Sequence, residues 1–189
     1  KSILGLWSHS RFSLGITALF FYEIAEISIN SFFINYVTDD NWLTNEQASW
    51  ALSMGALLLF FVGRLIGSFV MSKISAEKVL TFCGVCTVVC TALVMSGLGG
   101  VSRIALFAIY LFESIMFPTV FAISLNGLGA YTKRASSFLM MTPIGGAVGA
   151  LLMGAVADAT SMSVAFVVPM VGYAVVMVFA YLAMAKKLK

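Results

Sequence analysis

Charged residues are scarce in this chain of 189 residues. Asp, Glu, Lys and Arg together make up 10% of it, whereas a soluble domain carries roughly 25%. Hydrophobic residues account for 61%, so the chain has too little charge to cover the surface of a water-soluble globule. The composition predicts that the lipid bilayer is its solvent. The net charge of +3 is too small to indicate a nucleic-acid partner.

Histidine and cysteine are scarce as well. The one histidine, His9, lies before the first long apolar stretch. The cysteines Cys83, Cys86 and Cys90 fall in one apolar segment and are odd in number, which argues against a disulfide framework. The first two match C-x-x-C, yet neither a second ligand pair nor a nearby histidine completes a metal site. Buried cysteine packs as a small hydrophobe, so we expect no metal and no cofactor.

The sequence also gives no sign of an enzyme. A hydrolase inside a membrane needs a histidine or a pair of metal ligands within its spans, and the chain has neither an H-E-x-x-H nor a G-x-S-x-G motif. No secretory signal peptide is visible either, because the first apolar run is too long, contains glutamates and has no small-residue cleavage site.

Six stretches are long and apolar enough to cross a bilayer, which needs about 20 mostly apolar residues. Backbone groups in lipid must be paired within the segment, so each stretch is predicted to be helical. The predicted spans are 12–37, 46–71, 79–97, 102–125, 135–157 and 162–185. No other stretch is long enough for a separate soluble domain. We therefore predict an all-α membrane protein with one six-helix bundle over residues 1–189.

Lys and Arg lie almost entirely on one side of these spans. That side comprises the N-terminus, the links after spans two and four, and the C-terminal tail. Its nine cations are Lys1, Arg11, Lys73, Lys78, Lys133, Arg134, Lys186, Lys187 and Lys189. The other side has Arg103 together with the acids Asp39, Asp40, Glu46 and Asp158. Cytoplasmic loops carry the excess of Lys and Arg, so we predict cytoplasmic termini and a location in a bacterial inner (plasma) membrane.

A glutamate recurs at the same place in two halves of the predicted bundle. Spans one to three run in the opposite direction to spans four to six, and the first helix of each triplet has a glutamate near its middle, Glu26 and Glu113. Two inverted three-helix repeats are a design of secondary transporters. Six helices give this parity automatically, so the paired glutamates carry the inference.

Three polar residues share one face of the first span. Glu23, Glu26 and Asn30 are spaced by three and four residues, and Tyr22, Glu26 and Asn30 form the neighbouring stripe. A charge at the bilayer centre costs on the order of 3 kcal/mol, so this face must look onto other helices or a water-filled cavity. Burial disfavours the anion, and such an acid can take up a proton near neutral pH. We predict substrate binding by Tyr22, Glu26, Asn30 and Glu113, and proton coupling by Glu26 and Glu113.

The alternative is a neutral glutamic acid that only hydrogen-bonds a neighbouring helix, and Glu23 is the acid that best fits this structural role. Further candidates for a structural or gating role are Arg64, Pro118, Pro143, Gly145, Gly146 and Gly149. An arginine within a span can snorkel to the surface or pair with a carboxylate or a helix C-terminus. Prolines loosen helices, and small residues four apart allow close helix approach. Ordinary membrane packing explains the glycines equally well.

Three stretches contain longer motifs. Residues 22–36 read YEIAEISINSFFINY, residues 60–80 read FFVGRLIGSFVMSKISAEKVL, and residues 114–158 contain the run FP-T-F…GLG…TK..SSF…GG….MG..AD. In this order they resemble the seventh helix, the eighth helix with its following loop, and the tenth and eleventh helices of the fucose–galactose–hexose proton symporters of the major facilitator superfamily. The resemblance spans nearly all of this chain.

This resemblance implies two six-helix bundles around a central cavity, which rock to import a sugar with a proton. By the same resemblance Glu26 is a polar group of the cavity, Arg64 belongs to a cytoplasmic GR motif, and Pro118 and Thr119 belong to the tenth-helix motif. Glu23 departs from the family pattern, as does Glu113, because apolar or amide residues are expected there. Their departure leaves the substrate and the proton site open.

The resemblance extends only to the second half of a twelve-helix transporter. The start KSILGLWSHSRF resembles the end of a central cytoplasmic linker, so we expect a fragment of a longer chain. The alternative is that two six-helix copies pair, with Glu26 and Glu113 in place of acids from the other half. The expected partners are a sugar, a proton, the lipid bilayer, and either the missing N-terminal half or a second copy.

The function predicted is that of a secondary active transporter, or its C-terminal half. It would move a hexose or deoxyhexose such as fucose with a proton by alternating access. An exporter of drugs or metabolites is an alternative within transport. A non-transporting membrane sensor or structural subunit is another, because binding and transport use the same residues.

Overall fold

The computed structural model describes residues 3–39 and 41–188. Six helical segments within these residues are long and apolar enough to cross a membrane: Ser10–Asp39, Asn45–Met71, Ala76–Met95, Gly100–Leu125, Gly129–Ala159 and Met162–Met184. The prediction of an all-α membrane protein with six spans is therefore confirmed. Three of the charged residues used to predict its sides, Lys1, Asp40 and Lys189, lie outside the described residues.

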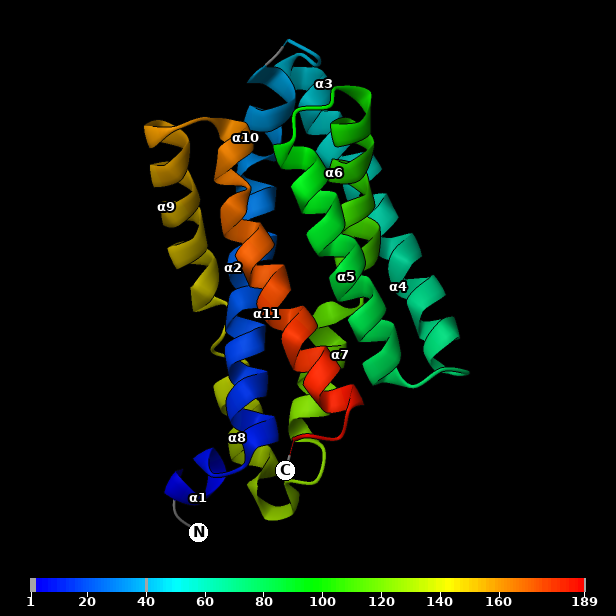
Figure 1. The fold of residues 1–189 in the computed structure, drawn as a ribbon, viewed down its shortest axis with the longest axis vertical. Helices are drawn as coiled ribbons and strands as arrows, with labels where there is room; N and C mark the ends of the chain where they lie inside the picture. The colour runs from blue at the N-terminus through cyan, green and yellow to red at the C-terminus, as the bar shows by residue number, and fades with distance from the viewer. Residues whose placement is uncertain (1–2, 40, 189) are drawn as a thin grey trace.

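Most spans consist of more than one helical piece, labelled in Figure 1. In the first triplet, the short helix α1 (Ile3–Trp7) precedes the first span, which is α2 (Ser10–Asp39). The second span consists of α3 (Asn45–Trp50), the π-helical turn η1 (Ala51–Ala56) and α4 (Leu57–Met71). The third span is α5 (Ala76–Met95). In the second triplet, the fourth span consists of α6 (Gly100–Glu113) and α7 (Met116–Leu125). The fifth span consists of the 3-10 turn η2 (Gly129–Tyr131), α8 (Thr132–Leu139) and α9 (Ile144–Ala159). The sixth span consists of α10 (Met162–Ala165) and α11 (Val167–Met184).

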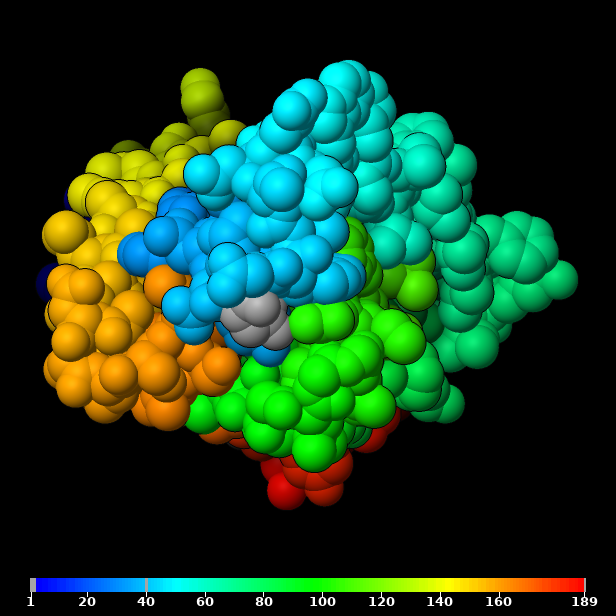
Figure 2. Space-filling model, turned by 90° about the horizontal axis from the view of Figure 1, so that it is seen from above, coloured from blue at the N-terminus to red at the C-terminus, as the bar shows by residue number. Residues whose placement is uncertain are grey.

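Helix α2 is the centre of the bundle. It packs against α11, α9 and α7, while α11 also packs on α5 and α6 packs on α4 and α5. Figure 1 shows both chain ends and the link from α4 to α5 at one end of the molecule. Figure 2, viewed from the other end, shows α9 and α4 on opposite flanks.

Local signals set where the second and third spans begin and end. The Thr44 hydroxyl accepts from the Gln47 backbone N–H at 3.3 Å, and the Gln47 side chain accepts from the Thr44 N–H at 3.1 Å, which forms a capping box at the start of α3. The third span is predicted to end near residue 97, and in the structure it ends within two residues of that point. Helix α5 ends at Met95, because Gly97 adopts a φ of 66°, a left-handed conformation that glycine tolerates.

The three prolines of the chain each accompany a break in a span of the second triplet. Pro118 follows the break between α6 and α7, Pro143 precedes α9, and Pro169 follows the break between α10 and α11. Proline has no N–H, so it leaves the carbonyl four residues earlier without its helical partner. The predicted loosening at Pro118 and Pro143 therefore corresponds to real interruptions, and Figure 1 shows the non-helical link before α9.

Glycines let α9 approach α2 to backbone contact. A Cβ atom on Gly145 would lie 2.6 Å from the Phe20 carbonyl oxygen, and one on Gly149 would lie 2.6 Å from the Ile24 carbonyl oxygen. At Gly146 it would meet the Ile27 side chain at 2.5 Å. Gly145 and Gly149 thus leave room for the α2 backbone, as small residues commonly do in membranes, whereas a side chain at Gly146 would displace Ile27.

Candidate functional site

A polar strip lies at mid-depth on one face of α2. It consists of Glu23, Glu26 and Asn30, which follow one another at intervals of one helical turn. Glu23 is only 5% exposed, whereas Glu26 and Asn30 are half-buried. Of the two neighbouring faces of α2, one packs on α9 through the backbone of Ile24 and the other meets α6 through Tyr22. The strip therefore has protein on both sides, and its Glu26 and Asn30 side chains remain partly exposed.

Two tyrosines connect α2 to the fourth span, one donating a hydrogen bond from each helix. Tyr22 of α2 donates to the backbone carbonyl of Glu113 at 3.4 Å, and Tyr110 of α6 donates to Asn30 Oδ1 at 2.9 Å. Both tyrosine rings are fully buried. Glu26 follows Tyr22 by one helical turn and so lies on the same side of α2. Because the Asn30 oxygen accepts from Tyr110, its NH₂ group is the part of the amide that the strip presents as a donor.

Glu113 lies deeper than the strip. Its side chain has no exposed surface, and Oε2 accepts a hydrogen bond from the hydroxyl of Tyr173 on α11. Among the described residues, Oε1 has no hydrogen-bond partner. The structure thus places Glu113 between α2, α6 and α11, where no solute reaches its carboxyl group in this conformation. A role for Glu113 in binding or proton coupling remains a prediction.

Arg64 reaches the break in the fourth span. Its Nε donates to the Ser114 carbonyl at 3.1 Å, and its guanidinium carbon lies 5.0 Å from the centre of the Phe60 ring. The Ser114 carbonyl is the one that Pro118 deprives of a helical partner, so an arginine on α4 takes the place of the missing N–H. It therefore links α4 to the break in the fourth span.

The predicted site residues thus separate into a group on the strip and a group around it. Tyr22, Glu26 and Asn30 lie together on α2, and Arg64 contacts the break in the fourth span. Glu113 lies on α6, where its backbone carbonyl accepts from the Tyr22 hydroxyl. Pro118 stands at the break, and Pro143 with the three glycines shapes the contact between α9 and α2. Thr119 is buried, and its hydroxyl donates to the Ile115 carbonyl at 2.6 Å.

Sequence reasoning missed Tyr110 and Tyr173. A signal existed for the first, because Tyr110 precedes Glu113 by three residues and so lies on the same helix face. Tyr173 comes from the last span, and nothing in its local sequence indicates a partner 60 residues earlier.

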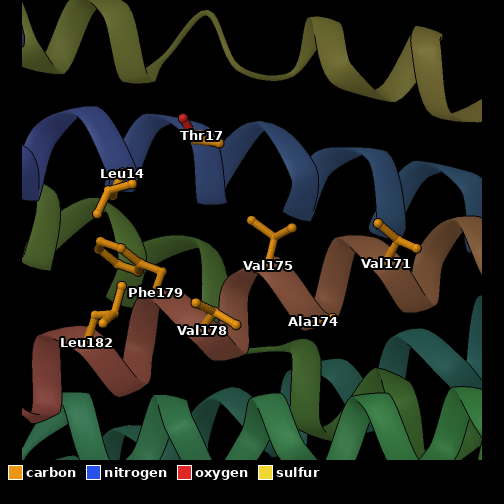
Figure 3. A pocket seen from close by; sticks show the side chains of 8 residues that line it. All are labelled: Leu14, Thr17, Val171, Ala174, Val175, Val178, Phe179 and Leu182. Atoms are coloured by element: carbon orange, nitrogen blue, oxygen red, sulfur yellow. The ribbon is translucent and has the colours of Figure 1, made fainter.

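The other hollows differ in character from the strip. A groove of about 310 Å³ lies between α2 and α11. Figure 3 labels the eight side chains that line it, and Thr17 is the one with a polar atom. Such a surface suits hydrocarbon rather than a sugar. Within the described residues there is also no cluster of three or more His, Cys, Asp or Glu that could hold a metal ion.

Comparisons with known proteins point to transporters. No known protein-family profile matches the chain. The chain is 35% identical over 173 residues to the glucose/galactose transporter of Brucella abortus biovar 1 (strain 9-941), an alignment that covers 89% of this chain and 41% of that protein. It is 32% identical over 169 residues to the L-fucose-proton symporter of Escherichia coli (strain K12), covering 87% of this chain and 38% of the symporter.

Solved structures give the same result. The chain superposes on FucP, a major facilitator superfamily transporter in the outward conformation, with a TM-score of 0.88 and 31% identity, over 92% of this chain and 42% of FucP. A variant of the E. coli fucose:proton symporter gives a TM-score of 0.91 and 30% identity, over 96% of this chain and 46% of the symporter.

The chain is therefore an integral membrane protein with the fold of one half of a major facilitator superfamily transporter. It is related to proteins named glucose/galactose transporter and L-fucose-proton symporter, which are transporters and not enzymes. The chain spans less than half the length of these relatives.

Proposed function

We propose that this chain is the C-terminal half of a secondary transporter that moves a hexose or deoxyhexose together with a proton. The observation that carries the proposal is the polar strip on α2, where two carboxylic acids and an amide occupy a partly exposed helix face at mid-depth. Acids within a membrane span are costly and mark substrate or proton pathways. The names of the relatives support a sugar as the solute and, for one of them, a proton as the coupled ion.

The strip offers the groups that a sugar needs. Asn30, held by Tyr110, can donate from its NH₂ group to a sugar oxygen, and the Glu26 carboxyl can accept from a sugar hydroxyl. In this proposal Glu26 takes up the proton, because it is the half-buried acid nearest to Asn30. Glu113 could do so only in a conformation that opens its contact with Tyr173.

The other wall of the proposed sugar site would come from a second six-helix unit, either the N-terminal half of a longer chain or another copy of this chain. Large apolar side chains on both flanks of the bundle are open to such a partner. They include Phe61 and Leu65 on α4, 58% and 57% exposed, and Leu151 on α9, 76% exposed. Rocking of the two units around the strip would give alternating access. Cytoplasmic termini complete the proposal, supported by the sidedness of Lys and Arg. The bacterial organisms of the relatives support a bacterial inner membrane as the location.

A binding screen of hexoses and deoxyhexoses on the purified chain, at an acidic and at a neutral pH, tests the site. At least one sugar should bind, and more tightly at acidic pH, because a sugar and a proton that are carried together favour each other's binding. If none of these sugars binds at either pH, the sugar site on this chain is excluded. Binding of a different metabolite in the same assay would favour an exporter.

Uptake into proteoliposomes separates a transporter from a sensor. The chain, reconstituted with its partner unit, should accumulate the sugar against its gradient when the outside is made acidic. Sugar binding without any such flux would support a sensor or structural subunit and contradict the transport proposal.

A further inference from the structure

A second hollow lies at the end of the bundle that contains both chain termini. Its volume is about 420 Å³, and it is bordered by the start of α2, the start of α5, the end of α7, and the end of α11 with Lys186 after it. It is far along α2 from the polar strip, since its α2 residue is Arg11 whereas the strip begins at Glu23. A separate role for this hollow is therefore possible.

Three cations from separate parts of the chain line this hollow. Arg11 comes from α2, Lys78 from α5 and Lys186 from the segment after α11. Among the described residues that line it, Glu77 is the acid, so three cations face one anion. Ser75 and Asn126 add a hydroxyl and an amide as neutral hydrogen-bond donors. This set of donors suits a phosphate oxyanion.

An apolar groove runs along the same two helices. The groove of Figure 3 extends between α2 and α11 from Val171 to Leu182, and Leu14 lines its α2 side. Leu14 is one helical turn from Arg11, and Leu182 directly precedes Ala183, which lines the basic hollow. Val171 and Val178 are 47% and 53% exposed. On a membrane span these exposed faces meet acyl chains.

We propose that this end of the bundle binds an anionic phospholipid: its phosphate headgroup enters the hollow between Arg11, Lys78 and Lys186, and one acyl chain lies in the groove between α2 and α11. A general excess of Lys and Arg on one side of a membrane protein explains why cations occur at this end. It does not explain why cations from three separate segments line one hollow that adjoins an apolar groove. Basic hollows between membrane helices are a known form of headgroup recognition.

The test is a thermal-shift titration of the purified chain in a neutral detergent. Phosphatidylglycerol, phosphatidylcholine with the same acyl chains, and inorganic phosphate are added in separate series. Phosphatidylglycerol should raise the melting temperature because it binds the folded state, whereas phosphatidylcholine and phosphate should raise it much less. Equal shifts with the two lipids would overturn the headgroup part of the proposal. Equal shifts with phosphatidylglycerol and phosphate would reduce the hollow to a site for free anions and overturn the lipid.

Variants locate the site. Replacing Arg11, Lys78 or Lys186 by Gln should weaken phosphatidylglycerol binding about fivefold for each charge removed. The matched control is Lys73→Gln with Lys133→Gln and Arg134→Gln, which removes three charges outside the hollow and should leave binding within about twofold of the unmodified chain. An equal loss in the control would show a general charge effect and contradict the site.

The groove is tested by Val178→Trp. Val178 is exposed, so the larger side chain can occupy the groove without entering the packed interior. The variant should weaken phosphatidylglycerol binding and leave phosphate binding unchanged. Unchanged phosphatidylglycerol binding would remove the acyl chain from the groove, while the direct comparison of the two lipids on the unmodified chain still decides the headgroup site.

Discussion

Tyr110 holds the amide oxygen of Asn30 at 2.9 Å across the contact between α6 and α2. The Tyr110 ring is fully buried and packs edge-on against Phe33, with 6.0 Å between the ring centres. Since the amide oxygen is occupied, the orientation of Asn30 on the polar strip depends on a residue of the fourth span. The two inverted triplets thus meet through a polar contact at the centre of the bundle.

Tyr110→Phe tests the strength of this contact. The change removes the donor and should lower the free energy of unfolding by about 1 kcal/mol, the usual contribution of one hydrogen bond. Thermal unfolding in detergent measures it. The control is Tyr181→Phe, because Tyr181 is 52% exposed and a substitution at such a surface position usually changes stability by less than about 0.5 kcal/mol. Equal effects of the two changes would contradict the proposed importance of the Asn30 contact.

Arg64 and Pro118 should be energetically coupled. Arg64→Ala leaves the Ser114 carbonyl without its donor, whereas Pro118→Ala restores an N–H that can reach the same carbonyl along the helix. The loss caused by Arg64→Ala should therefore be smaller in the Pro118→Ala background. A double-mutant cycle of unfolding free energies should give a coupling of about 1 kcal/mol. Strictly additive effects would show that the arginine does not replace the missing helical bond.

Gly149→Val should push α9 away from α2. A Cβ atom there would lie 2.6 Å from the Ile24 carbonyl oxygen and 2.6 Å from Ser28 Oγ. We expect a loss of about 1–3 kcal/mol in stability, as overpacking usually causes. Gly154→Ala on the same helix is the control, because its Cβ would meet the Phe32 ring at 3.4 Å. Comparable melting temperatures for the two variants would mean that the helices separate without cost.

Exposure predicts which glutamate exchanges a proton. Glu26→Gln keeps the size of the side chain and removes its proton-binding group, so the pH dependence of sugar binding should disappear. Glu113→Gln should keep that dependence, because Glu113 is fully buried against Tyr173. Titrations at acidic and neutral pH measure both. Loss of the pH dependence in Glu113→Gln alone would assign the coupled proton to Glu113 instead.

The sequence predicts the location of the spans more clearly than the contacts between their helices. Apolar length located all six spans, and a one-turn spacing placed Glu23, Glu26 and Asn30 on one face, because both properties depend only on neighbouring residues. The third span ends at Met95, close to its predicted end near residue 97, and a positive φ at Gly97 rather than hydropathy sets this boundary.

The contacts between helices could not be predicted in the same way. Glu113 looked equivalent to Glu26 by its position within a triplet, yet Tyr173 and the packing of α11 enclose it. The bond from Arg64 to Ser114 joins residues 50 positions apart. Such pairs depend on how the helices assemble, and local periodicity contains no information about that.

The placement of the prolines makes the bundle mechanically uneven. Every span of the second triplet is interrupted where a proline has already removed a backbone hydrogen bond, so each can bend there without losing another. The helices α2 and α5 of the first triplet are continuous rods. Deformation caused by a solute that enters between the units would therefore concentrate in spans four to six, while α2 keeps its acids at a constant depth.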